Sequence, residues 1–301
     1  MNIYSAISAN KWKTWLIMLL FVVFLTTVGF VFGKAEGSVV GYTTLALTIA
    51  GISSISSYFW ADKLVLASVG AKEIQEKDNP TLYHIVQNLA IGDGLPTPKV
   101  YIMKTDAPNA FATGRDPKHA VVCVTQGLLD RLNKAELEGV LAHELSHVKN
   151  YDTRLMAVVA VLVGAVVIMA NLFQNQLWWG GFRRSNDRED NGNIQLIFLA
   201  IAILFAILSP IIATLIQLAL SRKREYLADA SGAYLTRYPE GLASALEKIE
   251  KYKQPIPQVS NSTAQLFIEN PLKGKNVAGW FSNLFDTHPP IEERIKILRA
   301  M

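Results

Sequence analysis

The chain has 301 residues, a formal net charge of +4 and only 18% charged residues, whereas soluble globular domains average about 25%. Its mean hydropathy is positive, at +0.23. These values exclude a simple soluble enzyme and a disordered chain. No basic cluster with interleaved aromatic residues is present in the sequence, which argues against a nucleic-acid-binding protein.

Four uncharged stretches account for the shortage of charge. They are Thr14–Gly33, Ser38–Trp60, Leu155–Phe173 and Ile194–Leu220. A helix needs roughly 17–25 apolar residues to cross a bilayer. Outside these stretches, charged residues reach the share that is usual in soluble domains. The sequence therefore predicts a mostly α-helical membrane protein with about four transmembrane helices and a water-soluble domain.

This pattern divides the chain into four parts. We expect an N-terminal transmembrane hairpin, the first part of the soluble domain, a second transmembrane hairpin and a helical C-terminal part of the soluble domain. Their ranges are 1–60, 61–154, 155–220 (with a polar loop at 174–193) and 221–301. The first apolar run exceeds the 7–15-residue core of a signal peptide and a second run follows at once, so we expect an uncleaved hairpin. Segments 155–173 and 194–220 could instead be a helix pair buried against protein, which has the same composition.

Lysine and arginine residues near the ends of the spans predict the orientation. If all four segments cross, the soluble parts share one side, where the spans are flanked by Lys11, Lys13, Lys63, Lys72, Lys149, Arg154, Arg222, Lys223 and Arg224. The other side has only Lys34, Arg183, Arg184 and Arg188. Because basic residues concentrate in cytoplasmic loops, we expect a multi-pass protein of the cell membrane with its soluble domain in the cytoplasm. The single cysteine, Cys123, forms no internal disulfide and fits this reducing compartment.

The segment between the second and third spans has a mixed α/β pattern. Asn79 followed by Pro80 predicts an N-cap and a helix that extends to about Ala90. Three short strands are then expected at 99–103, 110–113 and 119–125. The turn at 114–117, Gly-Arg-Asp-Pro, joins the last two strands as a hairpin.

The rest of the soluble domain is expected to be helical. A long helix begins after Asn133, where Glu136 completes a capping box, and this helix could run straight into the third span. After the fourth span, helical patterns at 231–236 and 241–253 precede a loop that contains two prolines. A short final helix covers about 291–299.

The strongest chemical signal is the segment His143-Glu144-Leu145-Ser146-His147. Positions i and i+4 of a helix share one face, so both imidazoles can bind one Zn²⁺. The metal activates a water molecule, and Glu144 can take a proton from that water and pass it to the leaving amine. The alternative is a solvated helix face that carries two histidines. Neighbouring charges such as Glu138 and Lys149 place the motif in water, which argues against an intramembrane protease.

A third protein ligand is expected at Glu225. His147 lies shortly before the third span and Glu225 shortly after the fourth, so a hairpin of two spans returns both residues to the same membrane surface. Asp229, one helical turn beyond Glu225, is placed to accept a hydrogen bond from a ligand imidazole. From spacing alone, Glu225 could equally pair with Arg222 or Arg224 on a surface helix.

These motifs belong to a larger set of segments: Asn109–Gly114, Glu138–His147, Arg224–Asp229, and Thr287–Pro290 with Arg294. In this order, behind an N-terminal hairpin, they resemble the HtpX family of membrane-bound zinc endopeptidases, which is related to the CAAX-prenyl-protein endopeptidases. The resemblance covers nearly the whole chain, with no departure at the metal or catalytic positions. It implies a gluzincin-like α+β metalloprotease domain with a small β-sheet.

The resemblance also implies the metal chemistry. His143, His147 and Glu225 become the ligands of one Zn²⁺ per chain, and Glu144 becomes the general base. Asp229 becomes the support of a ligand histidine.

Substrate contacts are implied in the same way. His288 and Arg294 resemble a pair that contacts the substrate carbonyl or its oxyanion. Asn109, Ala110 and Phe111 begin a strand whose backbone would pair with an extended peptide at the edge of the sheet. The alternatives are a plain helix start after His288 with an exposed Arg294, and a core strand with Phe111 as a plug.

The expected partners are protein substrates and the lipid bilayer, with no nucleic acid. The resemblance implies hydrolysis of damaged or misfolded membrane proteins, as quality control under stress. A different class of function is a membrane scaffold or stress sensor with a structural zinc site. Such a site would need four protein ligands, whereas the sequence offers three and a base. His84 and His119 lack ligand spacing and are expected to be structural or exposed.

Overall fold

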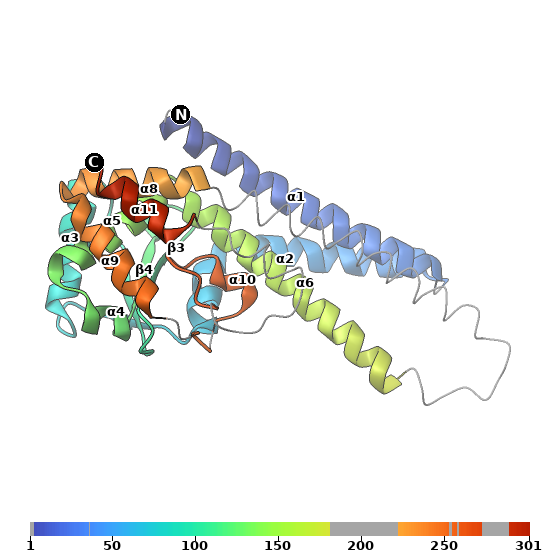
Figure 1. The fold of residues 1–301 in the computed structure, drawn as a ribbon. Coiled ribbons are helices and arrows are strands. Elements are labelled where there is room, and N and C mark those ends of the chain that lie inside the picture. The colour runs from blue at the N-terminus through green and yellow to red at the C-terminus, as the bar shows by residue number, and fades with distance from the viewer. Residues whose placement is uncertain (1–2, 36, 181–221, 253–254, 258, 273–288) are drawn as a thin grey trace.

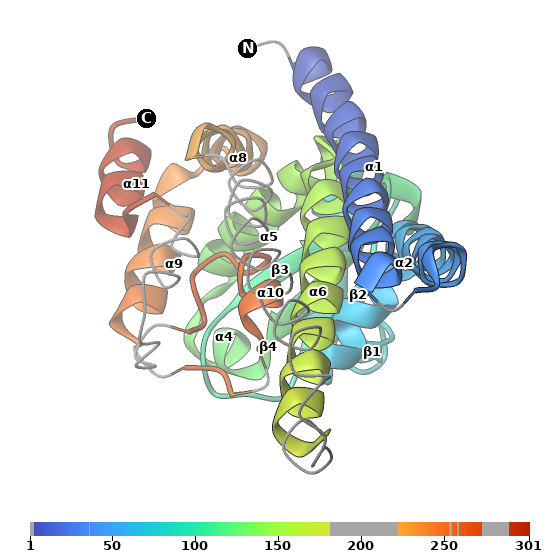
Figure 2. The same ribbon diagram turned by 90° about the vertical axis from the view of Figure 1, so that its right-hand side faces the viewer.

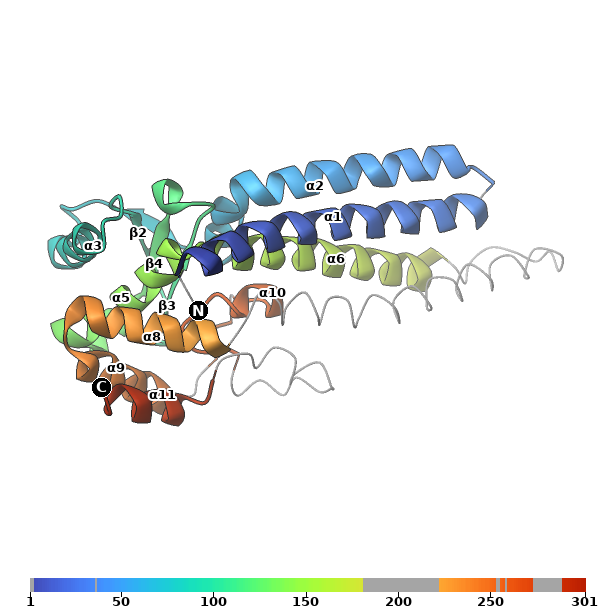
Figure 3. The same cartoon turned by 90° about the horizontal axis from the view of Figure 1, so that it is seen from above.

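The protein is described from a computed structural model, which covers residues 3–35, 37–180, 222–252, 255–257, 259–272 and 289–301. Within these ranges, three long helices extend together from a mixed α/β body (Figures 1 and 3). They are α1 (Ile3–Ala35), α2 (Val39–Ser68) and α6 (Asp152–Gly180). The N-terminal end of α1 and the first turns of α6 both lie beside the body, so these two helices leave it from the same side.

Two of these helices are long and apolar enough to cross a membrane, through the segments Ile7–Lys34 of α1 and Val39–Ser68 of α2. Among the described residues, a third candidate arises only if α5 (Lys134–Lys149) and the first part of α6, which meet at 81°, are counted as one broken span. The predicted N-terminal hairpin is therefore confirmed as a pair of candidate spans. The predicted stretch 155–173 lies in α6, and 194–220 lies outside the described residues.

A close contact at Gly29 joins α1 to α2. A Cβ added to Gly29 would lie 2.4 Å from the Cβ of Ala46 and 2.7 Å from the carbonyl oxygen of Tyr42. Membrane helices associate through such small residues, because lipid is as apolar as the side chains and only close packing favours the pair. A larger side chain at position 29 would therefore push the two helices apart.

A four-stranded sheet forms the centre of the body, with the strand order β1-β2-β4-β3. The strands are β1 (Lys72–Ile74), β2 (Lys99–Met103), β3 (Ala110–Thr113) and β4 (Val121–Thr125). β2 and β4 are parallel and the other pairs are antiparallel, so the predicted hairpin of β3 and β4 is confirmed. β4 begins at Val121 instead of His119, because Asp116 caps a short 3₁₀ turn over Pro117–His119. The sequence does not predict β1, since its three residues carry no apolar pattern.

Helices surround this sheet. Those of the body are α3 (Pro80–Gly92), α4 (Gln126–Arg131), α5, α8 (Arg222–Thr236), α9 (Pro239–Lys251), α10 (Asn261–Ala264) and α11 (Ile291–Leu298). α8, α9 and α11 lie on one side of α5 and the three long helices lie on the other (Figure 2). One buried core joins the sheet to α5 and α9 through Val122, Leu141 and Leu246. A second core joins Cys123 and Phe111 of the sheet to α1 and α6, and burial raises the pKa of the Cys123 thiol.

The helix predicted from Asn133 does not run on into the third span. Asn133 and Glu136 form the predicted capping box, but α5 ends at Lys149. Tyr151 then adopts a left-handed conformation, with a φ of 59°, and the chain turns through 81° into α6. The continuous helix that the sequence allows is therefore not formed, and neither glycine nor proline marks the break. α6 also continues through 174–180, where the sequence predicts a loop.

Candidate metal centre

Helix α5 supplies two histidines on one face. His143 and His147 are one turn apart and buried, and their Nε2 atoms lie 3.2 Å apart with the rings edge to face. The apolar residues of α5 pack into the core that it shares with the sheet and α9, which holds this face in place. The i, i+4 spacing thus produces the converging pair that the sequence predicts.

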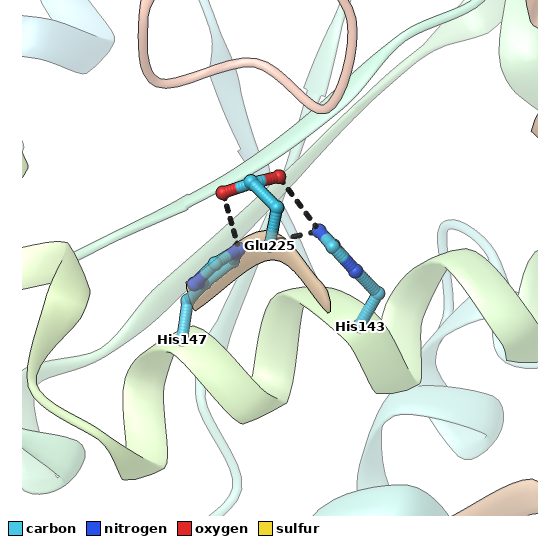
Figure 4. Close-up of side chains that lie close together, drawn as sticks. All are labelled: His143, His147 and Glu225. Carbon is cyan, nitrogen blue, oxygen red and sulfur yellow. Dashed lines mark hydrogen bonds and ion pairs between the residues drawn. The ribbon is translucent and has the colours of Figure 1, made fainter. Parts of the chain in front are cut away.

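Helix α8 brings Glu225 to this pair. Its Oε1 lies 3.5 Å from Nε2 of His147, and its Oε2 lies 3.7 Å from Nε2 of His143 (Figure 4). α8 comes this close because Gly232 faces α5: a Cβ there would lie 3.0 Å from the backbone nitrogen of His143. Arg224, the neighbour that could have paired with Glu225 on a surface helix, directs its guanidinium to Asp152.

The three donor atoms have the spacing of a zinc site. They lie within 4.8 Å of one another, and all three side chains are buried. Donors bound at about 2.0–2.1 Å to a tetrahedral ion lie about 3.3–3.4 Å apart. The two Nε2 atoms are 3.2 Å apart here, while Oε1 of Glu225 lies 3.5 Å from Nε2 of His147 and its other oxygen, Oε2, lies 3.7 Å from Nε2 of His143. Two imidazoles and one carboxylate leave one tetrahedral position for water, as in catalytic zinc sites. The residues therefore fit a bound zinc ion.

A carboxylate stands behind each histidine. Oδ1 of Asp229 lies 2.9 Å from Nδ1 of His143, as the sequence predicts, and Oδ2 of Asp152 lies 3.1 Å from Nδ1 of His147. A carboxylate on Nδ1 fixes the tautomer with its proton on that atom, which leaves the lone pair of Nε2 for a metal. The sequence does not predict the contact of Asp152 with His147. The only signal for it in the sequence is the position of Asp152 at the start of the helix that follows the histidine motif.

The charges around the histidines favour a cation. Burial alone would lower the pKa of His147, but the carboxylates of Glu225 and Asp152 outweigh burial and raise that pKa to about 9. The carboxylates therefore favour a positive charge in this pocket. A metal cation would supply that charge and would take the imidazole as a ligand.

Glu144 lies against the end strand of the sheet. Its side chain is buried, and its carboxylate accepts a hydrogen bond from the backbone N–H of Ala112 in β3. Burial raises the pKa of Glu144, while the two neighbouring histidines act in the opposite direction. A carboxylate with a raised pKa is suited to accept and then release a proton near neutral pH.

Arg294, from α11, binds Asp229 in the interior. Its Nε and Nη2 donate to the two oxygens of Asp229 at 2.8 and 2.7 Å, and its Nη1 lies 3.9 Å from Oε2 of Glu225. Burial alone would raise the pKa of Asp229, but Arg294 and His143 outweigh burial and lower that pKa to about 2. The side chain of Arg294 is 0% exposed, so the alternative of an exposed arginine is wrong.

The predicted substrate strand is the end strand of the sheet, and its outer edge is partly occupied. The carbonyl oxygen of Ala110 accepts a hydrogen bond from the N–H of Ile268, and Phe111 forms a bridge with Phe267. Asn109 is buried and donates from its side chain to the carbonyl oxygen of Glu269. β3 lies at the edge of the sheet, as predicted for a substrate strand. The side chain of Phe111 is also buried in the core, as predicted by the alternative in which it acts as a core plug.

The other histidines do not join the cluster. His84 and His119 are exposed and contact Glu76 and Asp116, as expected for residues without ligand spacing. His288 lies outside the described residues. Among the described histidines, only His143 and His147 therefore belong to a group that could hold a metal.

Comparison with known proteins places these residues in a family context. A family model described as peptidase family M48 matches residues 76–301. Proteins named "Protease HtpX homolog" from Dictyoglomus thermophilum and Lactobacillus acidophilus are 47% and 48% identical over 99% of this chain, which covers 94% and 100% of their own lengths. The crystal structure of S. mikatae Ste24p aligns with a TM-score of 0.47 and 17% identity, covering 93% of this chain and 62% of that longer chain.

Proposed function

The chain belongs to the HtpX group of peptidase family M48 and is a membrane-associated metalloprotease. From this premise, we propose that it is a zinc-dependent endopeptidase that hydrolyses misfolded or damaged membrane proteins. The observation that carries the proposal is the buried triangle of donor atoms from His143, His147 and Glu225. Its dimensions suit zinc, and Glu144 lies beside it on the same helix.

The roles of the residues follow from their partners. When bound, zinc supplies a Lewis acid that polarises the scissile carbonyl and makes a water molecule acidic. Glu144 takes a proton from the attacking water and delivers it to the nitrogen of the leaving amine. Asp229 and Asp152 keep the two histidines in the tautomer that presents Nε2 to the metal.

The substrate is proposed to bind as an extended strand along β3. Backbone pairing at Asn109, Ala110 and Phe111 would hold a scissile bond beside Glu144 without demanding particular side chains. The peptide would take the place of residues 267–268, which pair with Ala110 and Phe111 in the structure. The contact of Glu144 with the N–H of Ala112 supports this arrangement, because it places the base against the same strand. His288 and Arg294 are proposed from the resemblance to stabilise the substrate oxyanion. For Arg294 the geometry favours a role in holding Asp229, because its side chain is wholly buried and donates to both oxygens of that carboxylate.

We place the protease body in the cytoplasm, on a multi-pass protein of the cell membrane. Basic residues at the body end of the first two helices, such as Lys11, Lys13 and Lys63, support this orientation. Trp12 and Trp15 are 65% and 58% exposed near the same end of α1, as expected for side chains at the level of the lipid head groups. The metal centre would then face the membrane surface, within reach of membrane-protein chains.

The proposal is tested with purified full-length protein in detergent. Wild type is compared with Glu144→Ala and Glu225→Ala. Glu138→Ala serves as the control on helix α5, because the Glu138 side chain pairs only loosely with Lys134, at 3.8 Å. Zinc per chain is measured by mass spectrometry, and cleavage is followed on an unfolded membrane protein and an unfolded soluble protein. We expect Glu144→Ala to keep zinc and lose cleavage, Glu225→Ala to lose zinc, and Glu138→Ala to resemble wild type.

Each outcome bears on a separate part of the proposal. Chelator-sensitive cleavage by Glu144→Ala would refute its role as the base. A normal zinc content in Glu225→Ala would remove this residue from the ligand set. A wild-type protein that holds zinc but cleaves neither substrate would instead indicate a structural zinc site in a scaffold or stress sensor.

A further inference from the structure

A buried hydrogen-bond network connects the first membrane helix to the metal centre. Asn10, in the third turn of α1, is 3% exposed. Its Nδ2 donates to Oδ1 of Asp152 at 2.7 Å and to the carbonyl oxygen of Asn150 at 3.0 Å. Its Oδ1 accepts a hydrogen bond from Nη1 of Arg224 at 3.2 Å. The nitrogen and the oxygen of the Asn10 amide are therefore both hydrogen-bonded to residues that lie close in sequence to the proposed ligands.

The two carboxylate oxygens of Asp152 have different partners: one contacts the ligand His147 and the other accepts a hydrogen bond from Asn10 of the first membrane helix. Its Oδ2 faces Nδ1 of His147 at 3.1 Å, whereas its Oδ1 receives Asn10 and also Nη1 of Arg224 at 3.2 Å. A carboxylate held at one oxygen cannot rotate freely, so the direction of its other oxygen is set. The amide of Asn10, together with the guanidinium of Arg224, thus sets how Asp152 presents Oδ2 to His147.

The residues next to Asn10 on α1 are suited to a membrane surface. Trp12 and Trp15, two and five residues further along, are exposed, and Lys11 lies over the ring of Tyr151, 4.3 Å from its centroid. Tryptophan side chains prefer the head-group level of a bilayer, so they fix the depth of α1. In a bilayer, the same anchoring would set the depth of Asn10 relative to the membrane surface.

We propose that Asn10 is a positioning residue of the metal centre. Metal binding then depends on the packing of the first membrane helix against the protease body. Asn10 acts through Asp152 and the ring of His147 and does not touch the metal. This inference rests on the metal site of the proposed function. It assigns a role to the N-terminal hairpin beyond that of an anchor.

The test uses full-length protein in lipid nanodiscs and does not depend on activity. Zinc affinity is measured by competition with a chelator, and the geometry of the site is read from the visible absorption spectrum of the cobalt-substituted protein. The variants are Asn10→Leu, which keeps the size and removes the amide, and Asn10→Asp, which keeps the acceptor for Arg224 and removes both donors. Thr14→Val is the matched control, because Thr14 is buried one turn further along α1 and its hydroxyl donates only to the carbonyl oxygen of Asn10.

We expect Asn10→Leu and Asn10→Asp to weaken zinc binding by up to about tenfold and to shift the cobalt spectrum; tenfold is the lower end of the effect of removing a direct partner of a metal ligand, and Asn10 acts one residue further out, through Asp152. Thr14→Val should leave both readouts unchanged. In an Asp152→Ala background, the Asn10 substitutions should weaken binding no further, because the residue through which they act is gone.

Three results separate the failure of this inference from that of the proposed function. Wild-type zinc affinity and an unchanged cobalt spectrum in both Asn10 variants would overturn the inference. So would effects of Asn10 and Asp152 substitutions that multiply in the double variant, because they would then act by separate routes. A His147→Ala protein that binds zinc like wild type would overturn the proposed metal site itself.

Discussion

Replacement of Arg294 by methionine tests how the metal centre is held together. The side chain of Arg294 is wholly buried and makes two hydrogen bonds to Asp229, at 2.8 and 2.7 Å. Methionine fills similar space but leaves the Asp229 carboxylate buried without its cation. Removing one partner of a buried ion pair typically costs about 3–5 kcal/mol of unfolding free energy. For a body of this size, that corresponds to a thermal midpoint lowered by roughly 6–20 °C.

The assay is thermal unfolding of the metal-free protein in detergent, followed by tryptophan fluorescence. Arg299→Met is the matched control, because Arg299 follows the same helix but pairs with Glu240 and Glu247 in solvent. Exposed pairs contribute little to stability, so this control should unfold at the wild-type midpoint.

The same ion pair predicts a pH dependence. The pKa of Asp229 is lowered from 3.8 to about 2 in the folded protein, which corresponds to about 2 kcal/mol of stabilisation. Since the folded pKa is the lower one, this stabilisation is fully present above about pH 4 and is lost as the pH falls through about 2. In Arg294→Met, unfolding should depend less on pH in this window. An unchanged midpoint combined with a large loss of kcat would refute the reasoning and assign Arg294 to the substrate oxyanion instead.

Three further predictions concern the elements that build the site. Gly232→Ala should weaken zinc binding and lower the unfolding free energy by about 1–3 kcal/mol, because its Cβ would meet the backbone nitrogen of His143 at 3.0 Å; Gly51→Ala, where nothing lies within 4 Å, is the control. Asn133→Ala should lower the unfolding free energy by about 1 kcal/mol through loss of the cap of α5, with zinc affinity unchanged in an equilibrium titration. Removal of zinc with a chelator should abolish cleavage and lower the thermal midpoint, and both should recover on readdition of zinc, since a ligand that binds only the folded state stabilises it by mass action.

Local signals predicted most of the elements around the site. Asn79 caps α3 as expected, Asn133 and Glu136 form the capping box of α5, and the strands at 99–103 and 110–113 have the predicted bounds. In each case, the information lies within a few residues, because capping, turn chemistry and hydrophobic period are local. The pair His143 and His147 is predictable for the same reason, since a single helix places both rings.

The remaining features depend on contacts between segments far apart in the chain. The break at Tyr151 is favoured by a tertiary contact of its ring, over which Lys11 lies, and no residue at 149–152 is a strong breaker on its own. Asp152 acquires its partner only because that break turns α6 away from α5. The buried state of Arg294 likewise depends on Asp229, which is 65 residues earlier in the sequence.

The metal centre is therefore assembled from segments that are far apart in the chain. The contact of Asn10 with Asp152 closes 142 residues, and that of Arg294 with the ring of His143 closes 151. Closing such long loops costs chain entropy before any contact repays it, so an incomplete chain holds the two histidines on α5 without Glu225 or its supports. Two imidazoles alone bind zinc more weakly than three ligands with fixed tautomers, since each missing partner removes binding free energy. At the proposed metal site, tight zinc binding therefore depends on α1 and α11, which supply Asn10 and Arg294, as well as on α5 and α8, which carry the ligands.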